Sequence, residues 1–303
     1  MTRLKTLKEN ALLNDIKVEW LDASALRERE PNVTGRGALL VRASGIADYP
    51  AVARKMAQLI AEKGGVLIHG VEVSRVNDNP DYVEVISKER CWLARKVVLC
   101  SGLQADRLAR RSGVETDFQI VPFRGEYYRI HEEKKNIVTH MIYPVPDPAL
   151  PFLGIHLTPM INGDLTVGPN AVLGLSREGY PKFSTNLRDM ATYLAFPGFW
   201  KMLRSNLSSG MVELQDSLFK KSYLKKCQKY CPDIELRDLQ PYRAGIRAQA
   251  VTRKGEMMHD FHFLQTSNVL HVCKAPSPAA TSAIPIGRMI VERILEERVR
   301  PQA

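Results

Sequence analysis

Apolar side chains recur at helical spacing in an early segment of the chain. The residues that share one helical face are Val52, Met56, Leu59 and Ile60. Two glycines follow this segment directly and end the pattern. The sequence therefore predicts an amphipathic helix over 50–63.

Strand patterns follow this helix. Two mainly apolar runs, 66–69 and 96–100, predict buried strands. Alternation of apolar and polar residues predicts two further strands, over 71–76 and 82–86, which a turn-rich segment separates. The second apolar run continues through a Ser-Gly turn into a predicted helix over 105–111. In such an arrangement backbone N–H groups can meet a phosphate or a ribose.

The pattern changes near residue 120, because strands then follow one another without helices between them. These strands are predicted over 121–130, 141–143, 152–157 and 165–167 and form an antiparallel sheet. Helical spacing follows over 182–230, and two helices are expected before Glu30. The chain returns to a strand and a helix near its end. This order implies two lobes that the chain crosses more than once, and cofactor and substrate usually meet at a lobe boundary.

Composition is ordinary for a globular protein, with 45% hydrophobic and 25% charged residues among 303. One large domain or two closely joined domains are expected. No apolar run reaches the roughly 18 residues of a membrane span. The five cysteines have no framework spacing, which favours reduced thiols in a cytoplasmic setting.

The net charge of +10 raises the question of an anionic partner. Basic residues are scattered except for the cluster Lys220–Lys226 on a predicted helix. This cluster lacks the interleaved aromatic residues of a base-stacking surface, so no nucleic acid partner is predicted. A solvated helix face and peripheral attraction to acidic lipids are the two interpretations that remain.

The segment 271–283 carries the chemistry that points most clearly to a cofactor. It is predicted as a strand end, a turn of small residues and a helix that begins near Pro285. Free N–H groups and the positive dipole end at a helix N-terminus suit a flat, anionic cofactor. No Gly-x-Gly-x-x-Gly occurs anywhere in the chain, and no Gly-x-Ser-x-Gly argues for hydrolysis. Cys227 and Cys231 lack a second pair of ligands, so no metal site is predicted.

Six short strings of residues together carry a resemblance to one enzyme family. They are Pro122–Tyr128, Ile142–Pro148, Phe152–Thr158, Val167–Ala171, Arg243–Ala250 and Ala275–Ser282. In combination they resemble the L-2-hydroxyglutarate oxidase (dehydrogenase) family, within the D-amino-acid-oxidase-like group of FAD enzymes. The resemblance spans nearly the whole chain, from Glu19 to Val291.

The resemblance implies an oxidoreductase with FAD as cofactor that oxidises L-2-hydroxyglutarate to 2-oxoglutarate. Its partners would be this small dicarboxylate substrate and an electron acceptor, either oxygen or a membrane quinone chain. A cytoplasmic location follows, and peripheral association with the inner membrane stays open. The alternatives are an FAD-dependent amine or amino-acid oxidase of the same group, and a non-catalytic remnant that needs a separate nucleotide-binding half.

The resemblance also implies the fold class, α/β plus α+β. Residues 43–116 and 257–303 are expected to form an incomplete FAD-binding Rossmann-like lobe without its N-terminal βαβ unit. An interwoven antiparallel-sheet substrate lobe is expected from 1–42 and 117–256. Because the first strand of such a sheet is central and buried, its loss would cost on the order of 10 kcal/mol. The sequence thus predicts a fragment with impaired FAD binding.

A substrate with two carboxylates and a secondary alcohol needs cations and a base. Arg247 and Arg124 are predicted to bind the carboxylates, because the planar guanidinium can bond both oxygens; a structural ion pair between lobes is the alternative. His156 is predicted to accept the hydroxyl proton, and the alternative is a hydrogen-bonded core histidine. Tyr127 and Tyr143 are candidates for carboxylate hydrogen bonds, unless they only pack.

The resemblance assigns further residues to the cofactor. Val73 would lie on the strand that meets the adenine, and Ser101 and Gly102 in a turn near the pyrophosphate or ribose. The loop near the flavin ring would comprise Pro276, Ser277, Pro278, Ala279, Ala280, Thr281 and Ser282. Lys274 stands where the family is expected to have asparagine, and it either places a positive charge near the reduced flavin or points to solvent. A plain strand and a capped helix start are the alternatives for Val73 and for the loop.

Overall fold

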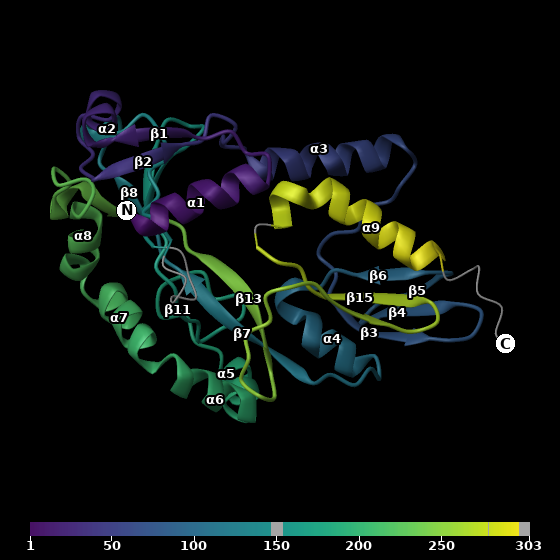
Figure 1. Ribbon diagram of the computed structural model, residues 1–303. Coiled ribbons are helices and arrows are strands. Elements are labelled where there is room, and N and C mark those ends of the chain that lie inside the picture. Colours follow the sequence, from purple (N-terminus) through teal and green to yellow (C-terminus); the bar gives the residue numbers. More distant parts are fainter. Residues whose placement is uncertain (147–153, 278, 297–303) are drawn as a thin grey trace. The chain divides into compact units, whose positions relative to one another are not determined.

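The structure, a computed structural model, describes residues 1–146, 154–277 and 279–296, and it divides into two compact units (Figure 1). Unit 1 comprises Met1–Asp48, Arg124–Val172 and Asn206–Gly245. Unit 2 comprises Tyr49–Phe123, Leu173–Ser205 and Ile246–Ala303. The chain therefore passes several times from one unit to the other. The predicted cofactor lobe (43–116 and 257–303) and substrate lobe (1–42 and 117–256) have boundaries that differ from those of the two units. Both lobes stay predictions.

Unit 1 begins with two helices and a two-stranded antiparallel sheet. The elements are α1 (Thr2–Leu13), β1 (Glu19–Asp22), α2 (Ala23–Arg29) and β2 (Gly37–Leu40). The Asp22 carboxylate caps α2 by accepting a hydrogen bond from the Ala25 N–H at 2.9 Å. The two predicted helices are confirmed, and the short strand β1 between them is an addition.

A four-stranded antiparallel sheet forms the centre of unit 1. Its strand order is β12-β8-β10-β9, from Leu239–Pro241, Tyr128–Ile130, Leu165–Gly168 and His156–Pro159. Helices α7 (Leu207–Leu218) and α8 (Lys220–Gln228) also belong to this unit. The antiparallel sheet and the helical region that the sequence predicts are both present.

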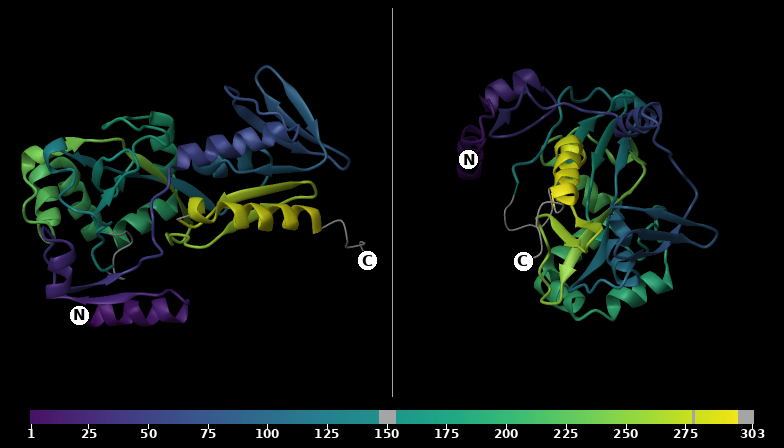
Figure 2. Two further views of the ribbon diagram at one scale, coloured as in Figure 1. Left: turned by 90° about the horizontal axis from the view of Figure 1, so that it is seen from above. Right: turned by 90° about the vertical axis from the view of Figure 1, so that its right-hand side faces the viewer.

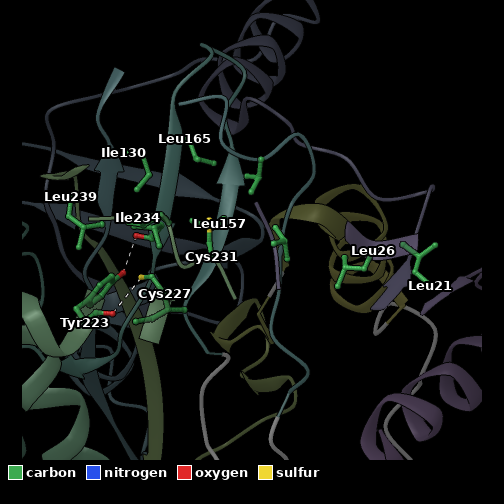
Figure 3. Packing of buried hydrophobic residues seen from close by; sticks show 14 residues of the cluster. Leu21, Leu26, Ile130, Leu157, Leu165, Tyr223, Cys227, Cys231, Ile234 and Leu239 are labelled. Atoms are coloured by element: carbon green, nitrogen blue, oxygen red, sulfur yellow. Dashed lines mark hydrogen bonds between the residues drawn. The ribbon is translucent and has the colours of Figure 1, made fainter. Parts of the chain in front are cut away.

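The core of unit 1 joins this sheet to α8 and to the N-terminal elements (Figure 3). Leu157, Leu165 and Tyr223 are fully buried within it. The Tyr223 hydroxyl donates a hydrogen bond to the Val167 carbonyl at 3.0 Å, and its ring meets the Tyr128 ring edge-on at 4.8 Å. The buried phenol thus has its polar atom satisfied by a strand of the sheet.

Unit 2 holds three small sheets. The first is antiparallel, with β3 (Val73–Asp78), β4 (Val83–Ser87) and β5 (Cys91–Ala94). The second has β14 (His262–Gln265) antiparallel to β15 (Val269–Lys274), which is parallel to β6 (Val97–Leu99). The third has the order β11-β7-β13, from Val172–Leu173, Phe118–Gly125 and Gly245–Thr252, and most of its residues fall in unit 2.

The helices of unit 2 include the predicted amphipathic helix and the predicted C-terminal one. They are α3 (Tyr49–Glu62), α4 (Ala105–Arg111), α5 (Leu187–Leu194), α6 (Pro197–Ser205) and α9 (Ala283–Glu296). Ile290 and Ile294 of α9 pack on Leu270 and Val272 of β15, and the helix runs beside these strands (Figure 2). Short 3-10 helices cover Gly102–Gln104 (η1) and Ala279–Ser282 (η4).

Two predicted strands do not form. The segment 141–143 has only an isolated bridge, between Ile142 and Leu157. The run 66–69 forms no strand, and Val66, Leu67 and Ile68 are 82%, 41% and 48% exposed. Within the described residues of unit 2 this run has no pairing strand and no covering helix, so its apolar character alone does not bury it. Among the described residues, no helix is long and apolar enough to cross a membrane.

Candidate active site

His156 and Tyr143 form a stacked pair of rings in unit 1. Their ring centroids lie 4.1 Å apart, and the ring planes meet at 15°. Backbone pairing produces this contact, because Ile142 and Leu157 exchange two N–H···O=C hydrogen bonds of 2.9 Å. The residue after Ile142 therefore lies opposite the residue before Leu157. The structure thus brings together two of the five residues that the sequence predicts on the substrate side.

The hydrogen bonding of His156 determines which ring nitrogen can act as a base. Its Nδ1 lies 3.3 Å from the Gly154 carbonyl oxygen, which can only accept a hydrogen bond. Nδ1 therefore carries the proton in the neutral ring, and the lone pair is on Nε2. Burial lowers the pKa of His156 from its ordinary value, although the Gly154 carbonyl favours the protonated ring. A neutral imidazole with a fixed tautomer can accept a proton from an alcohol.

Arg124, the second predicted carboxylate ligand, is paired within unit 1. Its guanidinium forms an ion pair with the Glu126 carboxylate, and both side chains are largely buried. The Asn170 side-chain N–H donates to Glu126 Oε2 at 3.3 Å, and its Oδ1 accepts from the Glu126 backbone N–H at 3.0 Å. Glu126 thus competes with any bound carboxylate for this guanidinium. The role of Arg124 in substrate binding stays a prediction.

Tyr127 lies next to this ion pair, against Gly168. A side-chain carbon added at Gly168 would meet the Tyr127 ring at 2.8 Å, and the backbone there has φ +146°. The Tyr127 carbonyl accepts a hydrogen bond from the Tyr242 N–H at 3.2 Å. The glycine therefore allows the close approach of this aromatic ring, which is half-buried.

Two predicted cationic residues interact in unit 2. Lys274 is the last residue of β15 and is 8% exposed, whereas Arg247 lies at an exposed position of β13. Burial, and then the positive charge of Arg247, lower the pKa of Lys274. Among the described residues no carboxylate forms an ion pair with Lys274. Two neighbouring cations, one of them buried, form an arrangement that an anionic ligand would stabilise.

The bend between β15 and α9 is open to solvent. Ala275 and Pro276 are half-buried, and Ser277, Ala280, Thr281 and Ser282 are exposed. Pro278 lies outside the described residues. The 3-10 turn η4 leads directly into α9, so the chain presents small side chains and backbone at the start of a 14-residue helix. The predicted loop and helix are thus present and uncovered, and their contact with a flavin stays a prediction.

The other three predicted cofactor residues also belong to unit 2. Val73 is paired with Ser87 in the antiparallel sheet and is half-buried. Ser101 precedes η1 without a side-chain cap, and Gly102 has φ +50° with open space where a side chain would start. A turn of this kind leaves room for a sugar or phosphate. Leu103 of η1 packs against Cys273 of β15, so the Ser101–Gly102 turn lies near the end of the strand that carries Lys274.

Glu126 and Asn170 are the polar residues near the site that the sequence reasoning missed. Glu126 follows Arg124 by two positions, so both side chains share one face of an extended segment. That spacing could have indicated an ion pair. The contact with Asn170 joins residues 44 positions apart and has no local signal.

Comparison with known proteins places the chain in a family. The sequence model of the FAD dependent oxidoreductase family matches residues 1–293. The chain is 48% identical over 295 residues to the L-2-hydroxyglutarate dehydrogenase of Escherichia coli (strain K12), covering 97% of this chain and 70% of that protein. It is 38% identical over 308 residues to the mitochondrial L-2-hydroxyglutarate dehydrogenase of Mus musculus, covering 96% and 66%.

Solved structures support the fold. An L-alpha-glycerophosphate oxidase from Mycoplasma pneumoniae with FAD bound aligns with a TM-score of 0.70 at 20% identity, over 97% of this chain and 69% of that one. A glycine oxidase from Geobacillus kaustophilus aligns with a TM-score of 0.63 at 16% identity, over 96% and 66%. The chain thus has the mixed helix and sheet fold of flavoenzymes, and it belongs to the FAD dependent oxidoreductase family.

Proposed function

We propose that this chain oxidises the hydroxyl group of L-2-hydroxyglutarate, giving 2-oxoglutarate, with FAD as the cofactor. The observation that carries the proposal is 48% identity to a named L-2-hydroxyglutarate dehydrogenase over 97% of the chain. The stacked, neutral His156 supports it, because oxidation of an alcohol needs a group that accepts the hydroxyl proton. The runner-up, amine oxidation, has the glycine oxidase likeness at 16% identity, which supports the fold alone.

The residues of unit 2 fit the flavin end of FAD. The buried Lys274 has no carboxylate partner among the described residues, and Arg247 adds a second positive charge. We propose that Lys274 lies near the flavin ring, where a cation favours the anionic reduced form. The exposed loop that ends at Ser282 would lie against the ring with its small side chains. Ser101 and Gly102 would contact the ribose or pyrophosphate.

In the proposed reaction the substrate hydroxyl loses a proton, and the carbon that bears it loses a hydride. FAD, when bound, accepts the hydride from the carbon that bears the hydroxyl. His156 Nε2 accepts the hydroxyl proton, while its Nδ1–H stays on the Gly154 carbonyl and fixes the ring. Arg247 and Arg124 bind the two carboxylates of the substrate, with Tyr127 and Tyr143 as further hydrogen-bond donors. Loss of the hydroxyl proton and of the hydride leaves the ketone of 2-oxoglutarate.

Finer parts of the prediction are carried forward as proposals. We propose that β6, β14, β15 and α9 belong to an FAD-binding lobe. The strand, turn and helix near Ser101 support this assignment. The electron acceptor is proposed to be oxygen or a membrane quinone chain, with the enzyme in the cytoplasm or at the inner membrane surface. A non-catalytic remnant that needs a separate nucleotide-binding half is the opposing outcome.

The test is flavin binding followed by turnover. The purified full chain is mixed with FAD and filtered, and the absorbance that stays with the protein measures its affinity. Turnover is then measured with L-2-hydroxyglutarate and an artificial electron acceptor, against the D enantiomer, glycine and sarcosine. We expect turnover of L-2-hydroxyglutarate alone. Flavin retention with oxidation only of the amines would overturn the proposed substrate. Absence of flavin retention and of turnover would favour the remnant.

Arg247 offers a separate test of substrate binding. The substitution Arg247→Lys keeps the charge but loses the forked geometry, and it is expected to raise KM for L-2-hydroxyglutarate about tenfold to a hundredfold. The measurement is steady-state kinetics on FAD-loaded protein. Arg237→Lys is the matched control, because Arg237 is 77% exposed and pairs with Glu235. An unchanged KM for the Arg247 variant would remove this residue from the substrate site.

A further inference from the structure

The carboxylate of Glu30 is buried at the end of α2 and accepts several hydrogen bonds. Glu30 is 3% exposed, and its backbone N–H donates to the Leu26 carbonyl at 2.8 Å, so the last turn of the helix fixes its position. One carboxylate oxygen accepts from the Thr139 N–H at 2.9 Å and from the Thr139 hydroxyl at 2.6 Å. The same oxygen accepts from the His140 N–H at 2.7 Å and lies 2.6 Å from His140 Nδ1. All these donors belong to one short segment, about 110 positions later in the chain.

Two neighbouring contacts attach the same segment to the N-terminal part of unit 1. The Asn32 side-chain N–H donates to the Ile137 carbonyl at 2.9 Å. Val138 is 3% exposed and packs in the core cluster that also contains Leu26. Residues 137–140, which we call the tethered segment, are therefore held by hydrogen bonds to their polar atoms and by burial of an apolar side chain.

The tethered segment leads directly into the stacked pair of rings. It ends two residues before Ile142, and the bridge from Ile142 to Leu157 places Tyr143 beside His156. Among the described residues this bridge is an isolated pair, so no adjacent pair of a ladder fixes its register. A slip of one residue would turn Tyr143 to the opposite face, because side chains alternate along an extended chain. The register therefore depends on how the residues beside the bridge are held, and on the N-terminal side the Glu30 carboxylate holds them.

We propose that Glu30 is a positioning residue for proton transfer at His156. Its carboxylate holds the tethered segment, the segment fixes the bridge at Ile142, and the bridge keeps the Tyr143 ring on the imidazole. The inference rests on the proposed function, because it concerns the place of the proposed base. Glu30 acts through the backbone and not through its charge, since burial and the Gly154 carbonyl are the two influences on the pKa of His156.

The test is the titration of His156, followed by NMR in the full chain with isotope-labelled histidine and assigned with His156→Asn. Burial lowers the pKa of His156, and loss of the stacked ring would admit water. Glu30→Ala is therefore expected to raise this pKa toward the ordinary range of histidine. The acidic limb of kcat/KM should move to higher pH in the same variant. At neutral pH kcat/KM should fall about tenfold to a hundredfold, the effect of a misplaced group.

Two further variants separate positioning from charge and from general stability. Glu30→Gln keeps an oxygen that accepts from the two backbone N–H groups, so the titration of His156 should stay close to that of the parent. Asp216→Ala removes another buried carboxylate of unit 1, which accepts from the Ser222 hydroxyl at 2.6 Å. It should lower the free energy of unfolding without moving the titration of His156, because a loss of stability alone does not change the surroundings of the imidazole.

The outcomes distinguish the positioning role from the proposed function. A parental titration of His156 in folded Glu30→Ala would overturn the positioning role, as would an equal change in Asp216→Ala or in Glu30→Gln. If Glu30→Ala does not fold, Thr139→Val takes its place. It removes only the hydroxyl contact and should move the titration in the same direction by less, and a parental titration would then overturn the role. The expected NMR change in a chain that does not oxidise L-2-hydroxyglutarate would support the tether and remove the proposed function.

Discussion

The substitution His156→Asn is expected to lower kcat/KM for L-2-hydroxyglutarate by about 10²- to 10⁴-fold, the range that a general base contributes. The asparagine side-chain N–H can still donate to the Gly154 carbonyl, which His156 Nδ1 now does at 3.3 Å. The variant thus keeps the local hydrogen bond but loses the basic nitrogen. Retained flavin in the variant is part of the expected result, because the proposed flavin contacts come from other residues.

The pH dependence of turnover provides the signature of this role. Burial lowers the pKa of His156 below its ordinary value, so the ring stays neutral at pH values where an exposed histidine would already be protonated. Since only the neutral ring can accept the proton, kcat/KM should stay level as the pH falls through the ordinary range of histidine. It should decrease only below the lowered pKa. In His156→Asn this acidic limb should disappear.

Tyr143→Phe is the matched control for this variant. It keeps the ring that stacks on His156 at 4.1 Å and removes only the hydroxyl. If the tyrosine binds a carboxylate, KM rises while the acidic limb of the pH profile is retained. A His156→Asn variant with parental kcat/KM and the parental pH profile would show that the histidine is a packing residue.

The elements that the sequence predicts best are those with a strong local pattern. The helix α3 has its apolar residues on one face, and the strand pair β3 and β4 alternates at period two. The run 66–69 has an equally apolar local pattern but is exposed, because burial depends on a neighbour that the run itself does not encode. The strand β1 was missed for the same reason, since it forms only by pairing with β2 some 20 residues later.

The sequence predicts which types of residue form the candidate site. It predicts few of the contacts between them. The sequence allows Lys274 either a flavin contact or a position in solvent; the structure buries it beside Arg247, and its contact with a flavin stays a prediction. The Tyr143 and His156 stack depends on the register between two segments, which is set by the pairing of Ile142 with Leu157. Alternation along one segment gives the face of a side chain, but it does not give the partner opposite.

The second large expected effect concerns a buried ion pair in unit 2 that the sequence did not indicate. Asp106 and Arg177 are 0% and 1% exposed, lie 71 positions apart and form an ion pair through both guanidinium nitrogens. Arg177 also donates to the Leu103 carbonyl at 2.6 Å, and Asp106 accepts from the Gln119 amide at 2.6 Å. The pair thus ties α4 to the segment before α5 and to β7.

Asp106→Asn is expected to lower the free energy of unfolding of unit 2 by about 3–5 kcal/mol, because it leaves the Arg177 charge buried without its counter-charge. Urea unfolding measures this change. Trp92 and Trp200 lie in unit 2 and Trp20 in unit 1, so in a Trp20→Phe background the fluorescence reports unit 2. The matched control is Glu178→Gln, which removes the exposed unit 2 carboxylate that accepts a hydrogen bond from the Gln104 amide at 2.7 Å, and it should cost at most about 1 kcal/mol.

The double substitution Asp106→Leu/Arg177→Met distinguishes the two contributions to this effect. A buried pair repays the cost of removing two charges from water only in part, so replacing both partners with apolar residues should recover most of the loss. Arg110 lies 3.5 Å from the Asp106 carboxylate and would lose this neighbour in both variants. If Asp106→Asn were as mild as Glu178→Gln, the Arg177 guanidinium would have to be reached by water. If the double variant were no more stable than Asp106→Asn, the hydrogen bonds to Leu103 and Gln119, and not the missing charge, would hold this part of unit 2 together.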